Sequence, residues 1–446
     1  MARDGAIEEP RVRRWRRAAL GAALAGALVG LPASGQILGP VGGALGGLPD
    51  VGQTVGRTTG DVLDRTDRLA GQALDPQALL DARARRLAEI IRRNSRFLEA
   101  DDAGNPVVRG EVLAVGPSAG ALAAARAAGF TVLRQSDVAA LGLQAVVLAP
   151  PASLSVRAAV ARLRRLDPAG SYDFNHVYAG AGVATAAPAT AGGDGAEAAT
   201  GVGARVGLID TGLAETLPVF AGLRIETRGF APGAPTAAAH GTATASLIAG
   251  RLGAFHGAAP GAGLYVADIF GATPAGGSAE ALAQALAWMV EARAPVINVS
   301  LVGPPNALVA AAVRAVSARG ARIVAAVGND GPAAPPAYPA SYPQVIAVTP
   351  VDAHGRVLPE AGHALHVDFA APGAGISAAN LAGGLSAVRG ASFAAPIVAG
   401  RLASLMRGES PSDAAAALAE LAKQARPAGR AAGHGVVGED VRLTHR

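Results

Sequence analysis

The sequence predicts an α/β protein with a doubly wound, mostly parallel sheet and helices on both faces, preceded by a smaller α+β domain. In residues 205–408, short apolar runs typical of buried strands alternate with longer segments of helical periodicity. Polar residues directly follow some of these runs, and open α/β sheets carry their chemistry at such strand ends. Residues 107–180 contain shorter units in the order βαββαβ, the order of a ferredoxin-like sandwich.

Composition limits the classes of function. The chain has 446 residues, half of them hydrophobic, which is enough for more than one core. It contains no cysteine, which excludes disulfides, a thiolate nucleophile and Cys-ligated zinc. The net charge is +5, but Lys423 is the only lysine, and no basic cluster is interleaved with the few aromatic residues. A nucleic-acid partner is therefore not expected.

Residues 1–35 have the pattern of an export signal. A basic segment, 11–17, precedes an uncharged run, 18–31, and small residues then offer a cut site after Gly35. The run is short for a transmembrane helix, which needs about 20 apolar residues. We expect export to the periplasm or the medium. Because the uncharged stretch continues to Pro49 if no cut occurs, an N-terminal membrane anchor is the alternative.

Residues 36–106 begin with a Gly-rich part and continue with a helical pattern. From Asp61 to Leu98, leucines and isoleucines recur at three- and four-residue spacings among arginines. This predicts one or two amphipathic helices, interrupted near Pro76. The basic face of such helices is most often a solvated surface.

The next elements are shorter. Expected strands are 108–115, 130–134, 144–148 and 173–178, and expected helices are 118–128 and 155–166. Residues 181–204 are rich in Ala, Gly, Thr and Pro and are predicted to be a linker, which is easily cut when it is exposed. In the larger domain, expected strands are 205–209, 264–269, 296–301 and 323–327, and expected helices are 240–250, 278–292 and 306–319. A last helix, 412–424, belongs to the closing segment 409–446.

Four polar residues of the larger domain follow strands or open helices. They are Asp210, His240, Asn329 and Ser392. Taken singly, each has a commoner structural explanation as a turn residue, a solvated helix start or an N-cap. Together they supply a nucleophile, a base to take its proton, a carboxylate to orient the base, and a donor for an oxyanion.

The motifs around these residues resemble those of the subtilisin-like (subtilase) serine proteases. They are Asp210-Thr211-Gly212, His240-Gly241-Thr242, Gly328-Asn329 and Gly390-Ala391-Ser392 with Ala395-Pro396, in this order. The resemblance covers residues 205–405 and implies a serine endopeptidase that works through an acyl-enzyme. It implies that Asp210 orients the imidazole, that His240 acts as general base and then acid, and that Ser392 is the nucleophile. Asn329 and the Ser392 amide would bind the oxyanion.

The resemblance also implies a substrate site. Ser300-Leu301-Val302 and Ala326-Val327-Gly328 are similar to the two strands that flank an extended substrate in this family. Val302 and Ala337 stand where the family commonly has glycine, which would narrow the first specificity pocket. We therefore expect a small or medium apolar side chain at P1, the substrate residue before the cut bond. Phe393 stands where the family usually has Met.

The βαββαβ unit is similar to the propeptides of this family, which help the protease fold and then inhibit it through their C-terminal tail. The resemblance implies a self-processing zymogen whose partners are its own propeptide and protein or peptide substrates. The composition of the linker places the expected cut between about 177 and 204. We expect a monomer that requires no cofactor. Calcium sites are common in the family, but Asp268, Asp352 and Asp368 are isolated in the sequence, so no ligand cluster is located.

Two alternatives of other classes stay open from the sequence. One is a pseudoprotease that binds peptides without cutting them. The other is a membrane-tethered scaffold protein whose N-terminal helices carry the main function.

Overall fold

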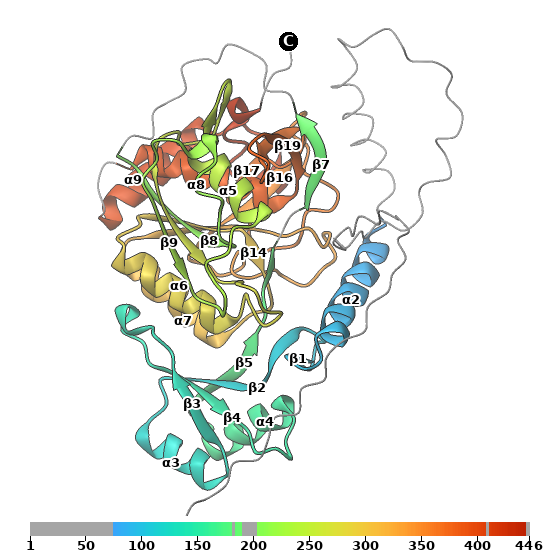
Figure 1. Cartoon of the computed structure of the whole chain (residues 1–446), viewed down its shortest axis with the longest axis vertical. Helices are drawn as coiled ribbons and strands as arrows, with labels where there is room; N and C mark the ends of the chain where they lie inside the picture. Colours follow the sequence, from blue (N-terminus) through green and yellow to red (C-terminus); the bar gives the residue numbers. More distant parts are fainter. Residues whose placement is uncertain (1–74, 181–182, 190–202, 407–409, 443–446) are drawn as a thin grey trace, which may run out of the picture. The chain divides into compact units, whose positions relative to one another are not determined.

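The computed structural model describes residues 75–180, 183–189, 203–406 and 410–442 (Figure 1). The expected export signal, the alternative membrane anchor and any helix before Pro76 lie outside the described residues, as do residues 181–182 and 190–202 of the expected linker. Within the described ranges, no helix is both long enough and apolar enough to cross a bilayer.

The N-terminal domain has the expected βαββαβ order. Its elements are β2 (Pro106–Val115), α3 (Ala119–Ala127), β3 (Thr131–Gln135), β4 (Ala145–Ala149), α4 (Val156–Leu166) and β5 (Ser171–His176). The strands form an antiparallel sheet in which β2 pairs with both β4 and β5, and β4 pairs with β3. Apolar side chains of the sheet, including Val112 and Phe174, pack against α4 residues such as Val160 in a separate core.

Two elements precede this domain. Helix α2 (Pro76–Arg93) packs on β1 (Leu98–Ala100) and β2, and β1 extends the sheet along β2. The expected interruption near Pro76 coincides with the start of α2, and any helix before it lies outside the described residues. Pro76 is the first residue of the helix, where its missing N–H costs nothing, and the Asp75 side chain caps it by accepting from the Gln77 amide.

The larger domain is built on a parallel sheet of seven strands. Their order is β17 (Phe369–Pro372), β16 (Val345–Val351), β15 (Arg322–Ala326), β13 (Val296–Val299), β8 (Arg205–Asp210), β12 (Gly263–Asp268) and β9 (Ile225–Gly229). All six pairings are parallel. Strands of this kind are covered on both faces, which explains why β16 is a continuous buried run.

Helices cover the sheet on both faces. They are α5 (Ala239–Ala249), α6 (Ala279–Glu291), α7 (Ala307–Ala318), α8 (Ala391–Leu405) and α9 (Pro411–Gln424). Helix α6 packs beside α7, whereas α8 packs between α5 and α9 (Figure 1). The doubly wound arrangement predicted from the sequence is confirmed.

Short antiparallel pieces were not expected from the sequence. Strand β6 (Ala179–Gly180) pairs with β14 (Leu301–Val302), and β7 (Val183–Ala189) pairs with β19 (Leu385–Arg389), which also pairs with β18 (Ile376–Ala379). A hairpin joins β10 (Arg251–Leu252) to β11 (Phe255–His256). Part of the expected linker is therefore strand, because the edge of β19 offers backbone groups with which it can pair.

Candidate active site

Asp210 lies at the carboxyl end of β8, in the middle of the parallel sheet, and its side chain is only 2% exposed. The Thr211 amide donates to its Oδ1 at 2.7 Å, and the Thr244 hydroxyl donates to its Oδ2 at 3.3 Å. These donors fix the direction of the carboxylate, and burial excludes the water that would otherwise solvate it.

His240 lies in the first turn of α5, directly in front of this carboxylate. Its Nδ1 is 2.7 Å from Asp210 Oδ1 and 2.9 Å from Oδ2, and its Nε2 is 3.0 Å from the Ser392 Oγ. An ionised carboxylate can only accept, so Nδ1 carries the proton and Nε2 presents its lone pair to the hydroxyl. Burial by itself would lower the pKa of His240, but the charge and hydrogen bond of Asp210 outweigh burial and raise it.

Ser392 is the second residue of α8 and is fully buried. Gly390 forms the turn from β19 into this helix with φ of 131°, a backbone conformation that side-chain-bearing residues rarely adopt. Four residues after Ser392, Pro396 has no N–H for the Ser392 carbonyl. The Ser300 hydroxyl donates to that carbonyl instead, at 2.9 Å, and the Asn298 Nδ2 donates to the Ser300 Oγ at 2.8 Å.

Ser300 and Asn298 thus support the nucleophile from the end of β13. Sequence reasoning assigned Ser300 to the substrate strand and did not consider Asn298 at all. The proline four residues after the serine is the signal that could have indicated an unpaired carbonyl at Ser392.

Asn329 follows β15 and lies beside the start of α8. The Ala391 amide donates to its Oδ1 at 2.9 Å, which fixes the side-chain amide and makes Nδ2 the donor end. Phe393 is fully buried, and its ring lies against the His240 ring with centroids 5.5 Å apart. Phe393 therefore packs against the imidazole as well as the core.

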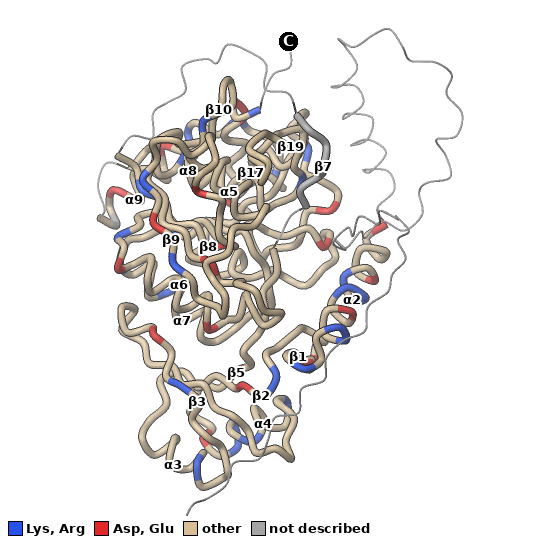
Figure 2. Tube along the Cα trace, viewed as in Figure 1, with Lys and Arg blue, Asp and Glu red and all other residues tan. Residues whose placement is uncertain are grey.

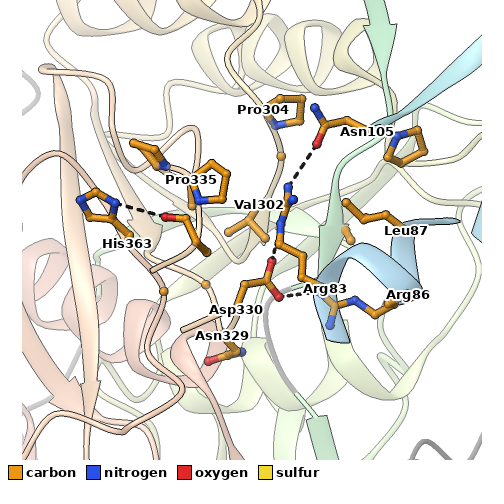
Figure 3. A pocket seen from close by; sticks show the side chains of 18 of the residues that line it. Arg83, Arg86, Leu87, Asn105, Val302, Pro304, Asn329, Asp330, Pro335 and His363 are labelled. Carbon is orange, nitrogen blue, oxygen red and sulfur yellow. Dashed lines mark hydrogen bonds and ion pairs between the residues drawn. The ribbon is translucent and has the colours of Figure 1, made fainter. Parts of the chain in front are cut away.

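A cavity of about 510 Å³ lies next to these residues (Figure 3). Four of the residues predicted to bind substrate line it: Val302, Val327, Gly328 and Ala337. A Cβ added at Gly328 would lie 3.3 Å from Val302 Cγ1, so the valine side chain narrows the space between the two strands. Two other predicted residues do not line this cavity. Leu301 of β14 pairs with Gly180 of β6, and Ala326 is buried in β15.

The chain's own strands lie on both sides of the nucleophile. On one side, Ala179 and Gly180 pair antiparallel with Val302 and Leu301, and a Cβ added at Gly180 would lie 3.7 Å from the His240 Nε2. On the other side, Val183 pairs with Arg389, three residues before Ser392.

Tyr178 anchors the first of these two strands. Its ring is buried, its hydroxyl donates to the Pro304 carbonyl at 3.0 Å, and its amide donates to the Gly277 carbonyl at 2.8 Å.

The carboxylates of Asp268, Asp352 and Asp368, which are isolated in the sequence, each accept backbone amide hydrogen bonds. Among the described residues, no group of three or more His, Asp or Glu side chains could hold a metal ion.

The larger domain is similar in sequence to a known family and to characterised relatives. The model of the subtilase family matches residues 201–436. M-protease of Shouchella clausii (strain KSM-K16) is 34% identical over 223 residues, which cover 48% of this chain and 56% of M-protease. Subtilisin Savinase of Lederbergia lenta is 34% identical over 223 residues and 79% of its length.

A solved structure shares the fold. It is that of fervidolysin from Fervidobacterium pennivorans, described as a keratinolytic enzyme related to subtilisin. The superposition covers 78% of this chain and 63% of that chain, with a TM-score of 0.61 and 19% sequence identity.

Proposed function

The chain belongs to the subtilase family of serine proteases, and we propose that it is an endopeptidase made as a self-processing precursor, with Asp210, His240 and Ser392 as its catalytic triad. The observation that carries this proposal is the geometry at His240. Its Nδ1 is 2.7 Å from a buried carboxylate and its Nε2 is 3.0 Å from a serine hydroxyl. A nucleophile, a base and a group that orients the base are thus in hydrogen-bond contact.

In the acylation step, His240 Nε2 takes the proton of the Ser392 hydroxyl as Oγ bonds to the carbonyl carbon of the substrate. Asp210 stabilises the imidazolium that forms. The oxyanion accepts N–H groups from the Asn329 Nδ2 and the Ser392 backbone. The imidazolium then protonates the leaving amine as the C–N bond breaks, and the same residues activate water to hydrolyse the acyl-enzyme.

The first substrate of this site is the chain itself. Strand β6 ends at Gly180, which pairs with Leu301, and β7 begins at Val183, which pairs with Arg389 near Ser392. Only Ala181 and Gly182 separate them, so the proposed cut falls on one of the three peptide bonds between Gly180 and Val183. The inhibitory N-terminal piece then includes α2 and the βαββαβ domain, and β6 leaves in the manner of a product strand.

Substrates after maturation are proteins or peptides with a small or medium apolar P1 residue. The narrow gap between Val302 and Gly328 supports this preference. We also propose export, on the pattern of residues 1–35, and action as a monomer.

A labelling experiment tests the proposal. A fluorophosphonate probe should label the wild-type chain at Ser392 and fail to label the Ser392→Ala and His240→Ala variants. Intact-mass analysis should find wild-type protein cut between Gly180 and Val183, with the Ser392→Ala chain uncut at that place. Equal labelling of the His240→Ala variant, or identical processing of the Ser392→Ala chain, would refute the catalytic assignment.

A further inference from the structure

Helix α2 precedes the βαββαβ domain but contacts the protease domain directly. Arg83 Nε is 3.1 Å from Asp330 Oδ2, and Arg86 donates to the other oxygen of the same carboxylate (Figure 3). Asp330 is the residue after Asn329, the proposed oxyanion donor. The helix therefore holds the turn on which the oxyanion site depends.

An apolar contact reinforces these ion pairs. Leu79 lies so close to Gly331 that a Cβ added there would be 2.6 Å from the leucine Cδ1. Leu79, Arg83 and Leu87 are spaced at four-residue intervals, so they share one face of the helix, and all three are half-buried. Arg85 and Arg92 are exposed. Figure 2 shows basic residues along α2, and two of them, Arg83 and Arg86, pair with Asp330 on the protease domain.

A polar network ties the same helix to a second place on the protease domain. Arg83 Nη2 donates to Asn105 Oδ1 at 3.1 Å, and Asn105 Nδ2 donates to Asp101 Oδ2 at 2.8 Å. That oxygen lies 3.2 Å from His176 Nε2, and His176 Nδ1 accepts from Asn306, the N-cap of α7, at 3.0 Å. The network runs from Asp330 to Asn306, both on the protease domain, through side chains of the N-terminal piece.

The helix also closes the cavity described above. Four of its residues, Arg83, Arg86, Leu87 and Ile90, line it together with Val302 and Gly328 of the protease domain. A substrate side chain that enters this space would have to share it with α2.

We propose that the turn Asn329–Gly331 is a docking surface for α2, and that α2 holds the N-terminal piece on the protease after the chain is cut, independently of strand β6. The proposal rests on the proposed function, since it concerns the state after the cut. Arg83 and Asp330 keep 21% and 20% exposure, so salt weakens this contact without abolishing the apolar one. Peptidase activity begins only when α2 leaves the turn.

Cross-linking tests whether the helix stays docked. The chain has no cysteine, so a Leu79→Cys/Gly331→Cys pair is the only pair that can oxidise. A Cβ added at Gly331 would lie 3.1 Å from Leu79 Cβ, close to the about 3.5–4.5 Å found in disulfides. We expect the cross-link in the uncut Ser392→Ala background and equally in the cut active chain. The control pair Arg85→Cys/Gly331→Cys should not form it.

Release kinetics supply a second test. In the full chain, Arg83→Gln/Arg86→Gln should speed dissociation of the N-terminal piece after the cut by about 2- to 30-fold. Hydrolysis of a small chromogenic peptide should begin correspondingly earlier. The matched variant Arg85→Gln/Arg92→Gln removes the same charge from the exposed side and should behave like wild type.

The outcomes separate the two proposals. A wild-type chain that neither cuts itself nor takes the fluorophosphonate refutes the proposed function. Docking by α2 is overturned if the cross-link is absent in the uncut chain, or is lost on cutting. It is also overturned if a chain that cuts normally releases its N-terminal piece at the same rate with and without Arg83 and Arg86.

Discussion

At the scale of single residues, His240 is subject to opposing influences. Burial disfavours its charged form, and the neighbouring carboxylate of Asp210 favours it strongly enough to raise the pKa. A general base must be neutral to accept a proton, so raising its pKa moves the onset of activity to higher pH.

We therefore expect kcat/KM of the mature enzyme to rise with pH through a midpoint above about 6.5, the ordinary value for histidine. The measurement is a pH profile of peptide hydrolysis. Asp210→Asn should lower the rate by about 10⁴-fold and shift the midpoint to lower pH. The role of Asp210 would be contradicted if the wild-type midpoint lay at the ordinary histidine value and Asp210→Asn did not change it.

Val302 offers a second prediction at this scale. Replacing it with glycine removes the side chain that lies 3.3 Å from a Cβ added at Gly328. The ratio of kcat/KM for a phenylalanine over an alanine P1 residue should then rise about 10- to 200-fold. Val302→Ala should give a smaller rise. A general loss of activity does not affect the result, because it lowers kcat/KM for both substrates equally. An unchanged ratio would show that another residue limits the size of the P1 pocket.

The sequence singled out Asp210, His240, Asn329 and Ser392, the residues of the proposed site, because each stands at a strand end or helix start that short-range patterns define. It did not reveal the support behind them. The bond from the Ser300 hydroxyl to the Ser392 carbonyl joins residues 92 positions apart, and nothing local to Ser300 indicates its partner. Tertiary contacts of this kind are decided by how the sheet and α8 pack.

At the scale of elements, the start of α8 depends on that contact. Pro396 removes the helical donor to the Ser392 carbonyl, and the buried carbonyl would be unsatisfied without Ser300. The proline and the serine therefore act as a pair that places the nucleophile.

Ser300→Ala should lower the free energy of unfolding by about 1–3 kcal/mol, the cost of an unsatisfied buried polar group. It should also reduce kcat more than it raises KM, because the position of Ser392 changes. Thermal unfolding and peptide kinetics measure the two effects. Ser404→Ala is the control, since the Ser404 hydroxyl is buried in the same helix and has no hydrogen-bond partner in the described parts of the chain. Equal effects of the two substitutions would refute the pairing.

The sequence predicts the strands that contain apolar runs. It does not predict the short strands that form only because a neighbouring strand pairs with them. The expected strand 296–301 is divided at Ser300, so that β13 stays in the parallel sheet and β14 turns to pair with β6. Strand β7 has no period-two apolar pattern, because small residues dominate it. Its conformation follows from the free edge of β19.

At the scale of the whole molecule, the N-terminal domain completes helices of the protease domain. Asp173 accepts from the Ala307 amide at 2.7 Å and Asn175 accepts from the Glu280 amide at 3.1 Å. These amides lie in the first turns of α7 and α6, where helical amides have no partner within the helix. The piece proposed to inhibit the enzyme thus also satisfies polar groups that the protease domain needs while it folds.

Arg134 of the N-terminal domain makes a charged contact with Glu280 of the protease domain. Its Nε donates to Glu280 Oε1 at 3.0 Å, and its Nη1 donates to Glu111 Oε1 within the N-terminal domain at 2.8 Å. The Ser136 hydroxyl also donates to Glu280, which is only 4% exposed while the N-terminal domain covers it. Removing Arg134 leaves that carboxylate buried without its cation.

We expect Arg134→Ala to destabilise the uncut precursor, held intact by Ser392→Ala, by about 1–3 kcal/mol. This loss of stability is smaller than the loss from breaking a fully buried ion pair, because the Arg134 side chain is 42% exposed. Once the N-terminal piece has left, Arg134 is gone and Glu280 is hydrated, so the mature protease should unfold at the same temperature whether it came from the wild-type or the variant precursor. Arg126→Ala, on the exposed side of α3, is the control and should leave the precursor unchanged. If the Arg134→Ala precursor melted at the same temperature as the Arg126→Ala precursor, the contact between Arg134 and Glu280 would hold the domains together only weakly. The helix caps from Asp173 and Asn175 would then have to account for the association of the domains.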